Sequence, residues 1–224
     1  MSLILNLETS TTNCSVSLSK YGEVLHYKSI DNVAYSHGKQ LHQLIKSMME
    51  EKATDLKHLN AVAVSCGPGS YTGLRIGVAA AKGLCFALDI PLISIDTLTL
   101  LANTHPVEQG LKIAMMDARR MEVYCQVLDA KNKVLEPSKA LVVDAASFKN
   151  ILDSQQVTFI GSGAEKCEAL IEHSNARFFS GIKPCARFMS ALSYAKALEN
   201  EFEDLAYFEP SYLKEFMIIP PKAK

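Results

Sequence analysis

Residues 66–82 read CGPGSYTGLRIGVAAAK, and this stretch organises the first half of the chain. The apolar residues 61–64 precede it, and its glycines lead into a segment rich in small residues. The order predicts a strand, a glycine-rich turn and a helix, which leaves backbone amides free at the helix N-terminus. Such a turn can bind an anion, or it can let a small-faced helix pack closely against another part of a protein.

The glycine spacing matches none of three common motifs. A nucleotide P-loop needs G-x-x-x-x-G-K-[ST], whereas this turn reads G-x-G-x-x-x-G and its next cation, Arg75, lies beyond it. Thr72 stands where a dinucleotide-binding fingerprint has its third glycine. The residues around Ser70 do not form the G-x-S-x-G of a nucleophile elbow. Phosphate binding at this turn is therefore disfavoured.

The predicted helix carries one face of small residues. Spacings of three and four place on that face Gly73, Gly77, Ala80, Ala81 and Leu84. Glycine inside a helix costs roughly 1 kcal/mol relative to alanine, so close packing must offset it. Two interpretations stay open: the face packs on the protein's own sheet, or it contacts another subunit.

Composition limits the classes of function. The 224 residues are 48% hydrophobic and 21% charged, which suits one domain or two small lobes with a buried core. The formal net charge of −1 argues against a strong basic field for nucleic acid or an anionic membrane. The N-terminus lacks a basic signal-peptide region, and no apolar run reaches the ~18–20 residues of a membrane span. We therefore expect a cytoplasmic protein with no membrane partner.

Cysteines and histidines give no sign of a metal site. The six cysteines are scattered without a C-x-x-C pair, so free thiols in a reducing compartment are expected. His37 and His42 are five residues apart, about 140° around a helix at ~100° per residue. They cannot share a metal as an i, i+4 pair could, and we predict neither a metal nor catalytic residues.

One pattern of strands and turns occurs twice. The first copy is a strand ending in Glu8, a polar turn over residues 9–13 and an alternating second strand. The second is a strand ending in Asp117, a turn over residues 118–120 and an alternating strand over residues 122–128. In each half a strand, a Gly-x-Gly and a helix follow later. The two acid-tipped meanders predict a duplicated α/β fold.

Two such lobes facing each other form the actin/Hsp70/sugar-kinase (ASKHA) architecture, with ribonuclease H-like lobes. We expect an N-terminal actin-like lobe over residues 1–104, with the glycine loop and the helices for dimerisation. A C-terminal actin-like lobe is expected over residues 105–224. The boundary falls in the polar link at 104–110.

In that architecture the two acidic turns face a nucleotide between the lobes, where acids organise magnesium through water. The candidate residues of a degenerate nucleotide cleft are Glu8, Thr9, Ser10, Thr11, Thr12, Asp117, Gly161 and Gly163. The first turn has no Lys or Arg to neutralise phosphate, and its Ser and Thr residues also simply form turns. At most, weak binding of ATP or ADP is expected there, and no cofactor is firmly predicted.

Six segments in order resemble the TsaB family, also called YeaZ, whose members have been labelled M22 glycopeptidase-like. They are ILNLETS (4–10), GPGSYTGLRIGVAAAKGL (67–84), SIDTLTLLA (94–102), DARRMEVYCQV (117–127), FIGSGAEKC (159–167) and PSYLKEF (210–216). The glycine run is very specific. Family members commonly have Asp where this chain has Glu8, which further weakens the case for magnesium.

The resemblance implies a non-catalytic subunit in threonylcarbamoyl transfer onto the adenosine beside the anticodon of tRNA. It implies a heterodimer with the TsaD transferase, joined by the TsaE ATPase, and an alternative homodimer. It leaves tRNA to be bound only through the complex. A four-helix contact is expected from two helical stripes, formed by His37, Leu41, Leu44, Met48, Gly73, Leu74, Gly77, Ala80, Ala81 and Leu84.

Two other functions stay open. The fold class includes phosphotransferases, and Asp117 is the plausible acid facing Glu8 in an active cleft. A peptidase is suggested only by the family label. It needs a nucleophile–base pair or a metal. Ser65, Cys66 and Ser70 have no histidine nearby in a recognisable motif.

Overall fold

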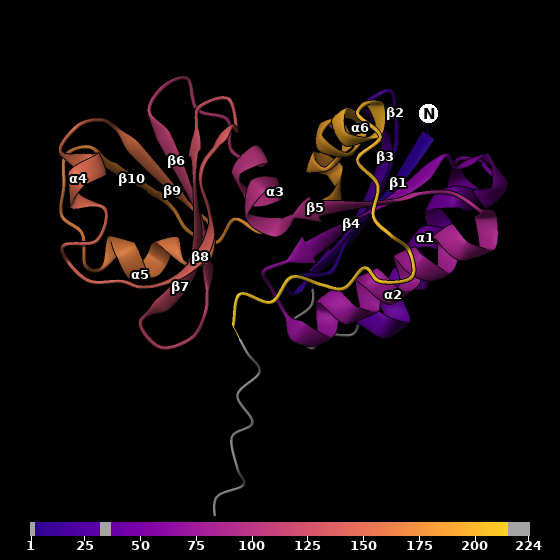
Figure 1. Ribbon diagram of the computed structural model, residues 1–224, viewed down its shortest axis with the longest axis horizontal. Coiled ribbons are helices and arrows are strands. Elements are labelled where there is room, and N and C mark those ends of the chain that lie inside the picture. The colour runs from indigo at the N-terminus through magenta and orange to yellow at the C-terminus, as the bar shows by residue number, and fades with distance from the viewer. Residues whose placement is uncertain (1–2, 32–36, 215–224) are drawn as a thin grey trace, which may run out of the picture.

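The computed structural model describes residues 3–31 and 37–214, and its strands form two five-stranded sheets side by side (Figure 1). The first sheet has the order β3-β2-β1-β4-β5. Its strands are β1 (Leu3–Glu8), β2 (Asn13–Lys20), β3 (Glu23–Asp31), β4 (Ala61–Gly67) and β5 (Leu92–Asp96). The antiparallel meander β1–β3 lies on one side, and β4 and β5 continue from β1 as parallel strands.

The second sheet repeats this topology. Its order is β10-β9-β6-β7-β8, with an antiparallel meander β6–β8 followed by the parallel strands β9 and β10. Its strands are β6 (Leu111–Asp117), β7 (Glu122–Asp129), β8 (Val134–Val142), β9 (Val157–Ile160) and β10 (Ala176–Phe179). The duplicated α/β fold predicted from the sequence is therefore confirmed.

Helices cover both faces of the first sheet. Alternating residues of β1 point to opposite faces, so Leu5 and Leu7 enter one apolar cluster and Ile4 another. The cluster around Leu5 is completed by α1 (His37–Glu51) and α2 (Tyr71–Leu88), with the short η1 (Leu56–His58) beside them. The cluster around Ile4 is completed by η2 (Ala186–Phe188) and α6 (Ser190–Leu198). The first sheet is thus the middle layer of three.

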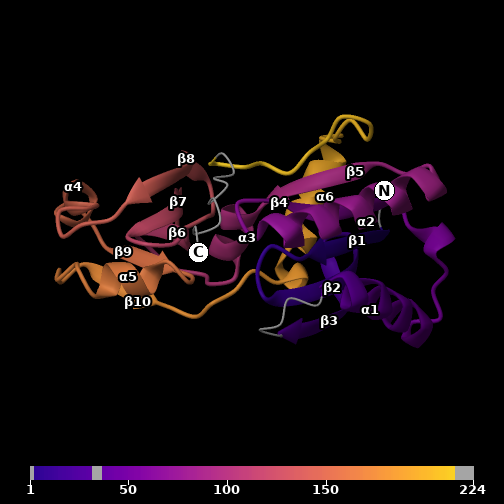
Figure 2. The same ribbon diagram turned by 90° about the horizontal axis from the view of Figure 1, so that it is seen from below.

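The helix α3 (Thr97–Asn103) lies between the two sheets (Figures 1 and 2). Leu98 and Leu101 of this helix pack with Ala114, Met116 and Ile160 of the second sheet. The opposite face of that sheet carries the short helices α4 (Lys149–Leu152) and α5 (Ala164–Glu168). Within the described ranges, no helix has both the length and the apolar character needed to cross a bilayer.

The chain beyond the second sheet returns to the first. The predicted boundary at 104/105 separates the sheets, but η2 and α6 pack on the first sheet instead of joining the lobe expected over 105–224. Their apolar stripe needs a sheet face, and the first sheet has one left uncovered by α1 and α2. The segment after α6 then runs along α2 to the second sheet (Figures 1 and 2). Ser211 N donates to Cys66 O at 2.7 Å, and Lys214 pairs with Glu122.

All six cysteines are free thiols, as the sequence predicts. Burial raises the pKa of the Cys66 and Cys167 thiols to about 12. Neither is therefore poised as a thiolate nucleophile, because only the deprotonated sulfur reacts.

Candidate functional site

Glu8 ends β1 and is completely buried. Its Oε1 accepts a hydrogen bond from Ser10 N at 2.5 Å, while Oε2 has no hydrogen-bond partner among the residues that the structure describes. Burial raises the pKa of Glu8, and hydrogen bonding at Ser10 offsets this only in part. The ionised form of this carboxyl is thereby disfavoured.

The glycine face of α2 sits directly on the turn that follows Glu8. Thr9 Oγ1 donates to Gly73 O at 2.8 Å, and Ser10 O accepts from Ser70 N at 2.7 Å. A Cβ at Gly73 would lie 2.1 Å from Thr9 O, and one at Gly77 would lie 2.3 Å from Thr9 Oγ1. The glycines thus allow the helix to pack against the protein's own turn, the first of the two interpretations that the sequence left open.

The rest of the turn is bound by distant parts of the chain. The ring Nε2–H of His37 donates to Thr11 O at 2.7 Å, and Thr12 Oγ1 donates to Asp31 Oδ1 at 2.8 Å. Lys183 Nζ donates to Thr12 Oγ1 at 2.9 Å and to Asp31 Oδ2 at 2.7 Å. The hydrogen bond from Lys183 lowers the pKa of Asp31. Sequence reasoning missed this lysine, because 171 positions separate it from Thr12 and no local pattern connects them.

The second acidic turn is exposed to solvent, and its Asp117 forms an ion pair with a lysine. Asp117 is exposed, and its Oδ1 accepts from Arg119 N at 2.5 Å and from Lys166 Nζ at 2.9 Å. Ser162 Oγ accepts from Asp117 N at 3.1 Å, which joins this turn to the second Gly-x-Gly.

The glycines of that second motif also serve close packing. A Cβ at Gly161 would lie 2.4 Å from Met115 O, and one at Gly163 would lie 2.8 Å from Met115 Cβ. The predicted cleft residues therefore form two local clusters, Glu8 to Thr12 with the first glycine run and Asp117 with the second. No group of three or more His, Cys, Asp or Glu side chains among the described residues is arranged to hold a metal.

Most of the predicted subunit surface lies inside the protein's own core. The buried members are His37, Leu41, Leu44, Met48, Gly73, Leu74, Gly77 and Ala81. The apolar stripe of α1 packs on the first sheet, so its side chains are unavailable to a partner. Ala80 and Leu84 of α2 are half-buried and reach the surface.

The outer face of α2 is apolar and open to solvent. Phe86 is 83% exposed, and Ala79, Gly83 and Ala87 are exposed on the same helix. A Cβ at Gly83 would meet no atom within 4 Å, so this glycine, unlike Gly77, is not needed for internal packing. Sequence reasoning missed this face because the sequence alone does not show which glycines of α2 pack against the protein and which face solvent.

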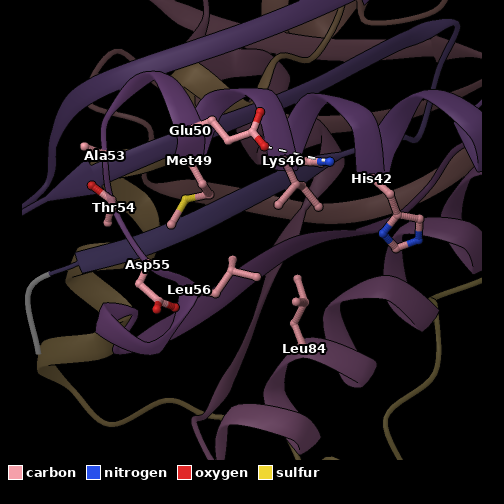
Figure 3. Close-up of a pocket in the computed structure, with 10 residues that line it drawn as sticks. His42, Lys46, Met49, Glu50, Ala53, Thr54, Asp55, Leu56 and Leu84 are labelled. Atoms are coloured by element: carbon pink, nitrogen blue, oxygen red, sulfur yellow. Dashed lines mark ion pairs between the residues drawn. The ribbon is translucent and has the colours of Figure 1, made fainter.

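A cavity of about 490 Å³ lies between α1, α2 and the chain before η1 (Figure 3). Its apolar lining comes from Ile45, Met49, Leu56 and Leu84, and its polar lining includes His42, Lys46, Glu50 and Asp55. Lys46 Nζ lies 3.8 Å from Glu50 Oε1, an ion pair along α1. The cavity therefore has lining residues from both α1 and α2.

Comparison with known proteins places these features in a family. The family model described as "TsaD: tRNA N6-adenosine threonylcarbamoyltransferase" matches residues 31–222. The chain is 37% identical to the tRNA threonylcarbamoyladenosine biosynthesis protein TsaB of Haemophilus influenzae, over 94% of this chain and 93% of that protein. The TsaB of Escherichia coli K12 is 34% identical, over 94% of each. The structure of YeaZ from Pseudomonas aeruginosa superposes with a TM-score of 0.82 at 27% identity, covering 95% of this chain and 100% of that one.

Proposed function

Since the chain belongs to the TsaB family of tRNA threonylcarbamoyladenosine biosynthesis proteins, we propose that it is a non-catalytic subunit that binds and activates a TsaD-type threonylcarbamoyltransferase. The matching family model describes that transferase, so the proposed pair consists of two related folds. The TsaE-type ATPase would join the pair, and tRNA would be modified by the assembled complex.

One observation carries the non-catalytic part of this proposal. The turn after Glu8 is the place predicted for phosphate, and its polar groups are bound to the protein's own α2. Opening it would break the Thr9–Gly73 hydrogen bond and expose the glycine contacts. This supports a structural role for the turn, because a nucleotide would have to displace a helix that the core holds in place.

The outer face of α2 is the proposed binding surface for the transferase. Phe86 is a large apolar side chain exposed to solvent, and the small residues beside it would let a partner helix approach closely. Aromatic side chains that become fully desolvated are frequent hot spots of protein interfaces. The face continues into the groove between α1 and α2, so helices of a partner would complete a helical layer. In the absence of the transferase, a second copy of this chain would bind the same face.

Reconstitution tests the role. Purified TsaD-type transferase and TsaE-type ATPase would be assayed with tRNA and threonylcarbamoyl-adenylate, with and without this chain. We expect product formation to depend on the chain. Full activity in its absence would overturn the proposed function.

The contact itself is tested with Phe86→Arg. This substitution places a charge on an exposed position, so the fold should survive while association with the transferase weakens about 30-fold or more, as for an aromatic hot spot of at least ~2 kcal/mol. Leu198→Arg is the matched control, because Leu198 is 63% exposed and ends α6, on the other face of the first sheet from α2. Gel filtration and titration would measure association. Buried positions such as Leu44 and Gly77 cannot serve here, because their substitution would damage the core.

A further inference from the structure

The turn between β6 and β7 presents two arginines on an unusual backbone. Arg119 has φ of 69° and Arg120 has φ of 51°, so both adopt the left-handed conformation. Glycine, asparagine and aspartate tolerate this region best, because a Cβ crowds the following carbonyl. Two arginines in succession therefore occupy positions at which backbone preference alone would select other residues.

Hydrogen bonds within the turn and from α5 fix its conformation. Ala118 N donates to Glu122 O at 3.0 Å, and Asp117 Oδ1 accepts from Arg119 N. Lys166 of α5 donates to Asp117, to the carbonyl of Arg120 and to the carbonyl of Glu122. These hydrogen bonds fix the turn, so its two guanidinium groups extend from a rigid base.

The acids that flank the arginines in sequence are already paired. Asp117 forms an ion pair with Lys166, and Glu122 forms one with Lys214 from the C-terminal segment. Arg119 and Arg120 are exposed, and within the part of the chain that the structure describes neither forms an ion pair. Among the residues that the structure describes, the tip of this turn therefore carries two positive charges without an ion-pair partner, on a chain whose net charge is −1.

We propose that Arg119 and Arg120 form a contact point for the phosphate backbone of the tRNA that the complex modifies. A guanidinium binds two phosphate oxygens with a planar pair of donors, and adjacent arginines can engage neighbouring phosphates. Phosphate contacts position an RNA without reading its sequence, which suits a subunit that orients a substrate for another chain's active site. The inference rests on the proposed function and adds a direct RNA contact to it.

The double variant R119G/R120G separates charge from folding. Glycine fits the left-handed backbone, so the melting temperature should stay equal or rise while two cations are lost. Binding of a fluorescent tRNA transcript would be measured with the full chain alone and in its mixture with the transferase. We expect about a tenfold loss of affinity at low salt and a smaller salt dependence, by about one to two in the slope of log K against log salt.

Two further variants serve as controls. K131A/K133A removes the same charge from exposed lysines of the β7–β8 turn, at the opposite end of the strand, and should leave RNA affinity unchanged. R119K/R120K keeps the charge and should retain most of the binding.

Four results would overturn the inference, and three of them concern RNA binding. These three are an unchanged affinity in R119G/R120G, an equal loss in K131A/K133A, and an absence of RNA binding by the wild-type chain in both settings. A loss of transferase association in R119G/R120G would assign the arginines to a protein contact and overturn it as well. Dependence of the transferase on the wild-type chain is measured separately, so a failure of the proposed function stays distinguishable.

Discussion

Glu8 and Asp117 end equivalent strands of a duplicated fold, yet their surroundings are opposite. Glu8 is fully buried beneath the long helix α2, whereas Asp117 is exposed and paired with Lys166 of the short helix α5. The 18 residues of α2 carry a glycine face that covers its turn, and the five residues of α5 leave theirs open. The two halves share the same strand order. They differ in the helix that follows each Gly-x-Gly, and this difference accompanies the burial of Glu8 and the exposure of Asp117.

The largest effect is expected where α2 meets the first turn. Gly73→Ala places a Cβ 2.1 Å from Thr9 O, so backbone must shift and the free energy of unfolding should fall by about 3 kcal/mol or more. Gly83→Ala on the same helix has open space and should raise it by about 0.5–1 kcal/mol. Urea unfolding measures both. Equal effects of the two substitutions would mean that α2 does not seal the turn.

An intermediate effect is expected from Glu8→Gln. Burial raises the pKa of Glu8 in the folded state, so between the unfolded value near 4.5 and the raised value the folded protein holds more protons than the unfolded chain. Wild-type stability should therefore fall as pH rises through that window, and Glu8→Gln should lack this component. At pH values above that window we expect the variant to be the more stable of the two. Urea unfolding at several pH values checks this, and parallel pH profiles for the two proteins would contradict it.

The smallest effect is expected at the second turn. Asp117→Asn keeps an oxygen that can accept from Arg119 N and removes an exposed ion pair with Lys166, so stability should change by about 0.5 kcal/mol or less. The change should shrink in 1 M salt, because exposed charges are screened. Thermal unfolding at low and high salt measures it. A cost as large as the effect at Glu8 would remove the contrast between the two turns.

The sequence predicted the topology well because strand and turn signals are local. Alternation in residues 14–19 and 122–128, with an acid before each turn, was enough to predict two matching meanders, and the sheets confirm them. The family assignment and the place in tRNA threonylcarbamoyladenosine biosynthesis are confirmed by relatives that cover almost the whole chain.

The sequence could not separate a core-facing stripe from a partner-facing one. Leu41, Leu44 and Met48 have the spacing of an amphipathic helix in either case, and the sheet beneath them decides that they are buried. The same limit applies to α2, where Gly77 meets Thr9 and Gly83 meets nothing. Only the position of each glycine relative to the turn distinguishes them.

The amino-acid sequence by itself therefore determined the repeated strand order, the two glycine turns and the family, since each depends on neighbours along the chain. Only the tertiary structure decided that Glu8 is buried, that Lys183 reaches Thr12 and that Lys166 and Lys214 pair with the two acids that flank Arg119 and Arg120. Burial and ion pairing depend on contacts between side chains that are far apart in the sequence, and residue spacing does not predict those contacts.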